Sequence, residues 1–252
     1  MAAHPFLDCP RPIPFAHRGG ASDAPENTLA AFARAVELGY RYLETDVHAT
    51  RDGVLMAFHD PDLRRTCGIP ARIEDLDFSD LRNVRVSGSE SIPTLDEVLG
   101  TWPNAMVNID CKSDSAVGPL IKRLRSGNAL DRTCIGSFSD RRLMAIRREF
   151  GDRACTSCGP REIAAIRTGS WIGRTSSTMA RAAQVPVRHG PLTILDRRFV
   201  DAAHRAGLHV HAWTIDDPAE MHRLLDLGVD GIMTDRPAVL LDILQSRGSW
   251  PV

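Results

Sequence analysis

Short hydrophobic runs alternate with amphipathic stretches along the whole chain. The hydrophobic runs fit strands of a parallel sheet, because such strands are covered on both faces. Eight strands are predicted, at residues 13–17, 41–47, 105–111, 133–138, 154–158, 182–187, 208–214 and 231–234. Helices are predicted between and after them, at residues 28–38, 94–99, 116–126, 141–149, 161–168, 196–205, 218–227 and 237–245.

This alternation indicates an α/β protein with a parallel sheet. Asn27 or Thr28 can cap the first helix and Gly39 can end it, while Gly207 and Gly228 end later helices directly before strands. Eight strand–helix units in 252 residues favour closure into a TIM (β/α)8 barrel. We therefore expect one barrel domain over residues 1–252.

One interval is too short for a parallel connection. Only residues 48–53 separate the second strand from the apolar run that follows, whereas a parallel crossover needs a dozen or more residues. Asp52-Gly53 is a strong hairpin turn signal. The second strand is therefore predicted to pass the rim of the barrel, turn, and return with His59 towards Glu44 and Asp46.

Another interval is longer than one helix requires. More than forty residues separate Asp60 from the strand predicted at 105–111. We interpret residues 61–93 as a small insertion over the C-terminal mouth of the barrel, with a loop and a helix around residues 74–83. Such insertions can exclude water and select the substrate.

Composition excludes several other classes of protein. The formal net charge is -1, which argues against a nucleic-acid partner or an electrostatic hold on anionic lipid. The apolar runs are too short for stable membrane insertion, and the first residues lack a signal-peptide pattern, so a cytoplasmic protein is expected. The six cysteines lack framework spacing, and the Cys155–Cys158 pair lacks a second metal-binding pair, so reduced thiols are expected.

Three carboxylates fall at the ends of neighbouring predicted strands. Glu44 and Asp46 are two residues apart and so share one face of a strand, and Asp110 ends the next barrel strand. Active sites of such barrels lie at this end, and oxygen ligands suit Mg²⁺ or Ca²⁺ better than zinc. We therefore predict a site for one divalent cation; solvated strand ends, or a pairing with Arg41, are the alternative.

Groups suited to a phosphate lie beside these carboxylates. Arg18 offers a planar fork of donors, Gly19 and Gly20 permit close approach of the backbone to a ligand, and Lys112 adds a positive charge or simply pairs with Asp110. His17 precedes Arg18 at the end of the first strand.

Two histidines are candidates for acid–base work. His17 and His59 are predicted at the same end of the barrel, where they can serve as general base and general acid. The alternatives are a core histidine for His17 and a solvated turn for His59. Trp213 is equally compatible with the core and with a wall for the substrate, whereas His189, His209 and His211 are assigned structural or supporting roles.

At these residues the sequence resembles the glycerophosphodiester phosphodiesterase family. The matching runs are residues 17–20, 25–28, 44–48, 52–60, 92–98, 108–112, 212–214 and 228–237. They span nearly the whole chain in the family's order, which is more specific than any single motif.

The resemblance implies a barrel of the phosphatidylinositol phospholipase C type and hydrolysis of a glycerophosphodiester to glycerol 3-phosphate and an alcohol. It matches Glu44, Asp46 and Asp110 to the metal ligands, His17 and His59 to the acid–base pair, and Arg18 and Lys112 to the phosphate contacts. Two departures stand out. Asp110 replaces the usual glutamate and is one methylene shorter, and Asp216 stands where an asparagine is usual.

Two other functions fit the same residues. One is a lysophospholipase D-like phosphodiesterase, which acts on a lipid diester with the same site. The other is a non-catalytic barrel that binds a phosphorylated polyol, although such a binder would be expected to lack a histidine or a carboxylate of the set. The sequence leaves the oligomeric state, the alcohol group of the substrate and the choice of metal open.

Overall fold

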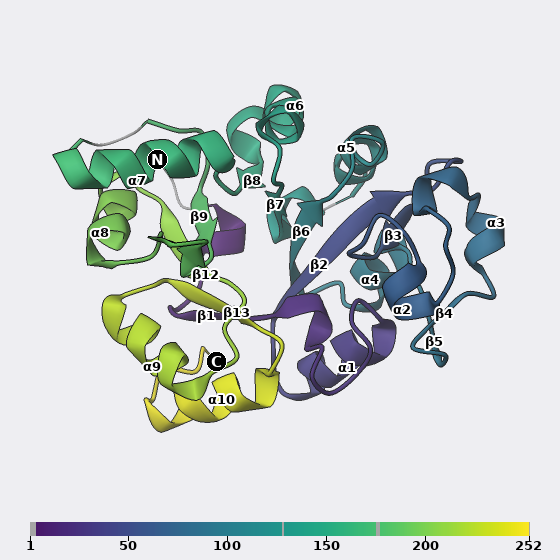
Figure 1. Cartoon of the computed structure of the whole chain (residues 1–252), viewed down its shortest axis with the longest axis horizontal. Coiled ribbons are helices and arrows are strands. Elements are labelled where there is room, and N and C mark those ends of the chain that lie inside the picture. The colour runs from purple at the N-terminus through teal and green to yellow at the C-terminus, as the bar shows by residue number, and fades with distance from the viewer. Residues whose placement is uncertain (1–3, 128, 175–176, 252) are drawn as a thin grey trace.

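Eight parallel strands form the barrel in the computed structural model, which describes residues 4–127, 129–174 and 177–251 (Figure 1). Their order around the barrel is β8, β7, β6, β2, β1, β13, β12, β9, and a parallel bridge between Ser157 and Ala182 joins the two ends. The strands are β1 (Ile13–Ala16), β2 (Tyr42–Ala49), β6 (Met106–Cys111), β7 (Thr133–Gly136), β8 (Cys155–Thr156), β9 (Ala182–Val185), β12 (His209–Ala212) and β13 (Gly231–Thr234). The predicted TIM barrel is confirmed.

Eight helices follow the strands around the outside of the barrel. They are α1 (Leu29–Glu37), α4 (Leu95–Thr101), α5 (Val117–Arg125), α6 (Asp140–Phe150), α7 (Pro160–Ile172), α8 (Arg197–Arg205), α9 (Pro218–Leu227) and α10 (Pro237–Ser246). Thr28 caps α1 by accepting a hydrogen bond from the Ala31 amide, and Thr94 forms a capping box with Glu97 on α4. The described residues also form five short 3-10 helices, at Pro5–Leu7, His17–Gly19, Ile73–Asp75, Leu130–Arg132 and Gly151–Arg153.

Apolar side chains fill the barrel and the layer between the strands and the helices. Inside the barrel, Phe15 and Tyr42 meet edge to face, with ring centroids 5.3 Å apart. Phe6, from the 3-10 helix that precedes β1, packs against both rings. These aromatic rings fill the N-terminal end of the barrel. The strand ends that carry polar side chains lie at the opposite end.

The predicted hairpin after the second strand is present. β3 (Leu55–Ala57) pairs antiparallel with β2, with Met56 opposite His48. The amide of Phe58 then donates to the carbonyl of Asp46 at 2.9 Å, which fixes the chain beside the site directly before His59.

The insertion after this hairpin contains short elements with a hydrophobic core of their own. These elements are α2 (Arg64–Cys67), α3 (Phe78–Leu81), β4 (Arg85–Val86) and β5 (Glu90–Ser91). The helix expected around residues 74–83 is present, but only as the single turn of α3. Leu76 is extended there and Asp77 begins α3 with a capping box to Asp80, which separates α3 from the turn at Ile73–Asp75.

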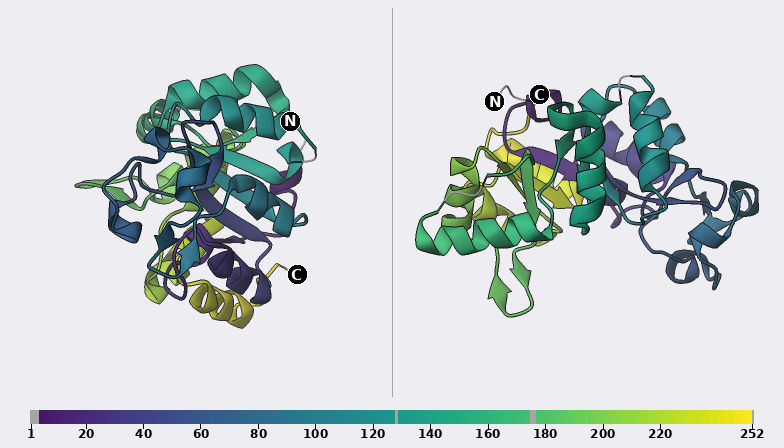
Figure 2. Two further views of the ribbon diagram at one scale, coloured as in Figure 1. Left: turned by 90° about the vertical axis from the view of Figure 1, so that its right-hand side faces the viewer. Right: turned by 90° about the horizontal axis from the view of Figure 1, so that it is seen from above.

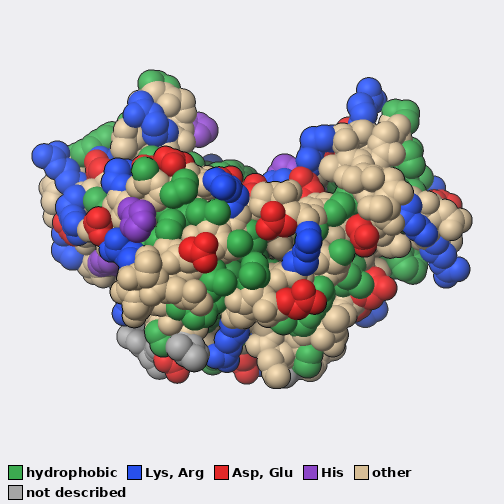
Figure 3. Space-filling model, turned by 90° about the horizontal axis from the view of Figure 1, so that it is seen from below, with side chains coloured by type: hydrophobic (Ala, Val, Ile, Leu, Met, Phe, Trp, Pro, Cys, Tyr) green, Lys and Arg blue, Asp and Glu red, His purple; other side chains and the backbone are tan. Residues whose placement is uncertain are grey.

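A second excursion was not expected from the sequence. The predicted strand 182–187 ends at Val185, and a small hairpin of β10 (Arg188–His189) and β11 (Leu192–Thr193) follows. Figure 2 shows this hairpin and the insertion projecting to the same side of the barrel, and Figure 3 shows a hollow between two raised parts. No helix in the described part of the chain is long and apolar enough to cross a membrane.

Candidate active site

The register of β2 and β6 brings the predicted carboxylates together. Asp46 is paired with Asp110 and Glu44 with Asn108, so these four residues occupy two rungs of neighbouring strands. All four line one cavity of about 580 Å³, which His17, Arg18, His59 and Lys112 also line. The structure thus collects every predicted metal, acid–base and phosphate residue at the C-terminal mouth.

His17 lies at the end of β1, between two carboxylates. Its Nδ1 is 2.7 Å from Oδ1 of Asp235, and its Nε2 is 3.8 Å from Oε2 of Glu44. Burial acts to lower the pKa of His17, but the charges of Glu44 and Asp235 outweigh it and raise the pKa above its usual value. Asp235 therefore holds the orientation of this ring, a role that the sequence analysis did not assign.

The pKa values of the two carboxylates of β2, Glu44 and Asp46, are shifted in opposite directions. Burial, and then the negative charge of Asp46, raise the pKa of Glu44 to about 7. Burial opposes ionisation of Asp46 as well, but the charges of Lys112 and Arg18 outweigh it and lower the pKa of Asp46. Glu44 is thus the member of the pair that holds a proton most readily.

Asp46 is surrounded by donors. Lys112 Nζ lies 2.9 Å from its Oδ1, while Arg18 Nε at 3.1 Å and Asn27 Nδ2 at 3.0 Å face its Oδ2. Lys112 Nζ also donates to Oδ2 of Asp110 at 2.7 Å. The ammonium group therefore lies between two of the predicted metal ligands.

The predicted ligands fit a cation in chemistry but are not arranged around a common point. Within residues 4–127, 129–174 and 177–251, no group of three or more His, Cys, Asp or Glu side chains is placed to hold a metal ion. Yet Oδ1 of Asp110 is buried without a hydrogen-bond partner among the described residues, and Glu44 is destabilised as an anion. A buried carboxylate oxygen without a partner is costly, and a cation beside it would remove that cost.

The two glycines of the turn at residues 17–20 pack against other parts of the protein and do not line the cavity. Gly19 and Gly20 have φ angles of +84° and +97°, and a Cβ would lie 2.7 Å from the Ala31 side chain at Gly19 and 2.5 Å from Pro237 at Gly20. The close approach foreseen for a ligand is therefore made by α1 and α10. Arg18 itself has a φ of +51°, a strained conformation that places its amide 3.1 Å from Oε2 of Glu44.

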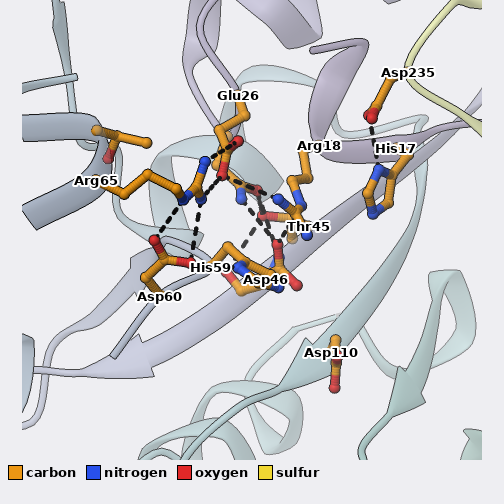
Figure 4. A network of polar contacts seen from close by, with 12 residues as sticks. His17, Arg18, Glu26, Thr45, Asp46, His59, Asp60, Arg65, Asp110 and Asp235 are labelled. Atoms are coloured by element: carbon orange, nitrogen blue, oxygen red, sulfur yellow. Dashed lines mark hydrogen bonds and ion pairs between the residues drawn. The ribbon is translucent and has the colours of Figure 1, made fainter. Parts of the chain in front are cut away.

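His59 reaches the site on the returning hairpin and has its own aspartate. Its Nδ1 is 2.6 Å from Oδ1 of Asp60, and its carbonyl contacts Nε2 of His48 at 3.1 Å. In the view of Figure 4, Asp46 lies between His59 and His17. Each of the two histidines thus has its Nδ1 in contact with an aspartate.

The remaining aromatic and histidine candidates divide between the mouth and the interior. Trp213 lines the cavity and meets Phe138 edge to face, with ring centroids 5.7 Å apart. His189, on the β10–β11 hairpin, also lines the cavity. His211 is fully buried, and burial lowers its pKa to about 3, whereas His209 begins β12 at the opposite end of the barrel.

Sequence reasoning missed three side chains that hold this site together. Asp235 follows β13 as His17 follows β1, and these strands are neighbours, so the rule that sites lie at strand ends could have identified it. Glu26 lies in one of the runs that match the family but was assigned no role, and Arg65 gave no signal at all. Arg65 lies in the insertion, thirty-nine residues from Glu26, and their contact exists only in the folded chain.

Comparison with known proteins adds a family to this geometry. Residues 17–239 match the model of the glycerophosphoryl diester phosphodiesterase family. The chain is 41% identical to a probable glycerophosphodiester phosphodiesterase 2 of Mycobacterium tuberculosis, over 94% of this chain and 92% of that protein. It is 30% identical to the human lysophospholipase D GDPD1, over 91% of this chain and 85% of that protein.

A solved structure shares the fold. A phosphodiesterase of Oleispira antarctica, determined in complex with the product sn-glycerol-3-phosphate, superposes with a TM-score of 0.78 at 22% identity. The match covers 93% of this chain and 97% of that one. At this identity the likeness concerns the fold alone.

Proposed function

This chain belongs to the glycerophosphoryl diester phosphodiesterase family, and on that premise we propose that it is a metal-dependent hydrolase of glycerophosphodiesters. Its products are glycerol 3-phosphate and an alcohol. The observation that supports this most is the presence of two histidine–aspartate pairs and three carboxylates around one cavity.

The phosphate is bound by the basic groups at the mouth. Arg18 presents its guanidinium fork and Lys112 its ammonium to the phosphate oxygens, because both already face the cavity beside Asp46. A divalent cation, Mg²⁺ or Ca²⁺, would be held by Glu44, Asp46 and Asp110, and when bound it polarises a phosphoryl oxygen and a substrate hydroxyl.

His17 and His59 carry the protons. One removes a proton from the attacking oxygen and the other gives a proton to the leaving oxygen, each through the ring nitrogen that its aspartate leaves free. Asp235 and Asp60 fix the two rings and stabilise the charged imidazolium.

A panel of glycerophosphodiesters tests this proposal. After chelation, the protein is assayed with Mg²⁺ or Ca²⁺ restored, and glycerol 3-phosphate is measured with a coupled dehydrogenase. We expect turnover that requires the cation. Binding of glycerol 3-phosphate without turnover of any diester would instead support the phosphopolyol-binding alternative.

A second candidate substrate is a lysophospholipid, and the apolar side chains that line part of the cavity favour it. Away from the carboxylates the cavity is walled by Ile163 and Ala164 of α7, by Val185, and by Leu192 and Ile194 of the β10–β11 region. Phe138, Trp171 and Leu192 line it while being 66%, 50% and 41% exposed. An acyl chain would cover this apolar surface, and the likeness to a lysophospholipase D agrees with it.

The two substrates can be separated by one substitution in the apolar wall. We expect Ile163→Asp to lower kcat/KM for lysophosphatidylcholine by about tenfold or more, since two lost methylene contacts already give that factor. Turnover of glycerophosphocholine, which lacks the chain, should change little. Ile69→Asp, an exposed apolar position in the insertion, is the control. Equal losses for both substrates would argue against an acyl site.

A further inference from the structure

Arg65 connects the insertion to the catalytic cavity. It lies on α2, whose position is fixed by the adjacent Leu63, a fully buried member of the insertion's own hydrophobic core. The Arg65 side chain is 49% exposed, yet its guanidinium is directed back towards the barrel. It contacts both the loop after β1, at Glu26, and the loop after β3, at Asp60.

The guanidinium makes four hydrogen bonds to two carboxylates (Figure 4). Nε and Nη2 donate to Oδ2 and Oδ1 of Asp60 at 2.6 and 3.2 Å. Nη1 and Nη2 donate to Oε2 and Oε1 of Glu26 at 2.9 and 2.6 Å. Burial favours the neutral forms of both carboxyls, but the hydrogen bonds from Arg65 together with the charges of Arg65 and His59 outweigh it, and the pKa of each carboxyl is lowered.

The two carboxylates lead to different parts of the machinery. Oδ1 of Asp60 is 2.6 Å from Nδ1 of His59, and Oε1 of Glu26 accepts from Nη1 of Arg18 at 3.1 Å. Glu26 and Arg18 lie on the loop after β1, whereas His59 and Asp60 lie on the loop after β3. One guanidinium therefore joins the proposed acid–base loop to the proposed phosphate-binding loop.

We propose that Arg65 is a positioning residue that fixes His59 and Arg18 relative to each other through Asp60 and Glu26. The inference rests on the proposed function for the roles of His59 and Arg18. The insertion thus serves the reaction by bracing two catalytic loops, in addition to any contact it makes with the alcohol group.

Stability alone is a poor reason for this arrangement. Exposed ion pairs contribute little to folding, and the same insertion holds such a pair, Arg72 with Glu74, at 2.9 and 2.5 Å. The Arg65 contacts differ because the planar fork satisfies two carboxylates from separate loops at once. A lysine at this position would keep the charge but lose the fork.

Kinetics of Arg65→Ala, Arg65→Lys and the matched control Arg72→Ala test the proposal. We expect Arg65→Ala to lower kcat for glycerophosphocholine by about 10- to 100-fold, because small displacements of catalytic groups have effects of this size. Arg65→Lys should be intermediate, and Arg72→Ala should match the parent protein. In the His59→Ala background, Arg65→Ala should lower kcat by a smaller factor than in the parent protein, since only Arg18 is then left for it to position.

An NMR measurement tests the proposed positioning of His59 by Arg65 without requiring turnover. In protein labelled with ¹⁵N-histidine, His59 should show one fixed tautomer with a hydrogen-bonded Nδ1, and Arg65→Ala but not Arg72→Ala should average this signal. If Arg65→Ala left the His59 signal or kcat as in Arg72→Ala, the proposal would be overturned. Absence of turnover in the parent protein would instead contradict the proposed function, and the His59 signal would still decide the positioning role.

Discussion

The two ends of the barrel hold the same pair of side chains in different surroundings. At the mouth, Nδ1 of His17 is 2.7 Å from Asp235, and at the opposite end Nε2 of His204 is 2.7 Å from Asp230. The two aspartates flank the same strand, β13, one directly before it and one directly after it. Pair geometry alone therefore cannot distinguish a catalytic site from a structural one.

Both carboxylate oxygens of Asp230 have hydrogen-bond partners. Its Oδ1 accepts from Arg11 at 2.6 Å, and its Oδ2 accepts from the Val210 amide at 2.8 Å in addition to His204. Burial favours the neutral acid, but the hydrogen bonds from His204 and Arg11 outweigh it and hold the pKa of Asp230 far below its usual value. These contacts tie the N-terminal segment, α8 and β12 to the start of β13.

At the mouth, by contrast, the carboxylates are not all paired with hydrogen-bond donors. Asp235 is 30% exposed, Asp110 keeps a buried oxygen without a partner among the described residues, and Glu44 has a raised pKa. We infer from this comparison that an unpaired carboxylate oxygen beside a cavity, rather than a histidine–aspartate contact, identifies the proposed active site.

The largest expected difference between the ends is catalytic. His17→Ala should lower kcat by about 10²- to 10⁴-fold, the range that general acid–base groups contribute. His204→Ala should leave kcat within about twofold, because it lies at the end of the barrel without the cavity. Steady-state assays on glycerophosphocholine measure both, and similar losses in the two variants would remove the distinction drawn between the ends.

Cation binding should stabilise the protein through the mouth alone. At a concentration one hundred times the dissociation constant, Mg²⁺ or Ca²⁺ should add about 2.7 kcal/mol to the free energy of unfolding. Asp110→Asn should weaken this gain, whereas Asp230→Asn should keep it. Thermal melts with the cation and after chelation provide the measurement; a gain that survives in Asp110→Asn would place the cation elsewhere.

Removing the charge of each aspartate should affect stability in the opposite order. Asp230→Asn should cost about 1–3 kcal/mol of unfolding free energy, because it weakens several hydrogen bonds to one buried carboxylate. Asp235→Asn should cost less than about 1 kcal/mol, as expected for a partly exposed pair. Urea titrations compare them, and a larger loss for Asp235→Asn would contradict the structural role of Asp230.

The smallest expected effect is the pH dependence of the His204 pair. The hydrogen bond to Asp230 raises the pKa of His204, so this pair's contribution is fully present below the unfolded value of about 6.5. The contribution is lost as the pH rises through the higher folded pKa, and also in strong acid as Asp230 becomes protonated. Because His204 is partly exposed, we expect at most about 1 kcal/mol.

Urea titrations of the parent protein and His204→Gln across pH measure this contribution. The two stability curves should differ near pH 5 to 6 and converge in alkali. A difference that grows as the pH rises would contradict the assigned sign.

Most of the barrel could be predicted because its signals are local. Apolar runs located all eight strands, and Asp52-Gly53 together with the short interval predicted the return of His59. The strands differ from prediction mainly at their ends; β8, for example, is only Cys155–Thr156 rather than residues 154–158. Strand ends depend on pairing with neighbours, which a local pattern does not encode.

The two excursions could not be predicted in the same way. The β10–β11 hairpin has only two residues in each strand, and the insertion consists of one-turn helices around its own small core. Elements this short have no stable pattern by themselves, since tertiary contacts rather than propensity hold them. The contact of Arg65 with Glu26 and Asp60 depends on that packing.

The barrel, the identities of the groups at its mouth and the end at which they gather could all be read from the sequence, because strand periodicity and connection length are local properties. Which of these groups have hydrogen-bond partners depends on contacts between segments far apart in the chain, and these became visible only in the folded protein. Folding placed Lys112 between Asp46 and Asp110, gave His17 its partner Asp235, and brought Arg65 across from the insertion. Hydrogen bonds and pKa values depend on distances between residues remote in the chain, and folding alone sets those distances.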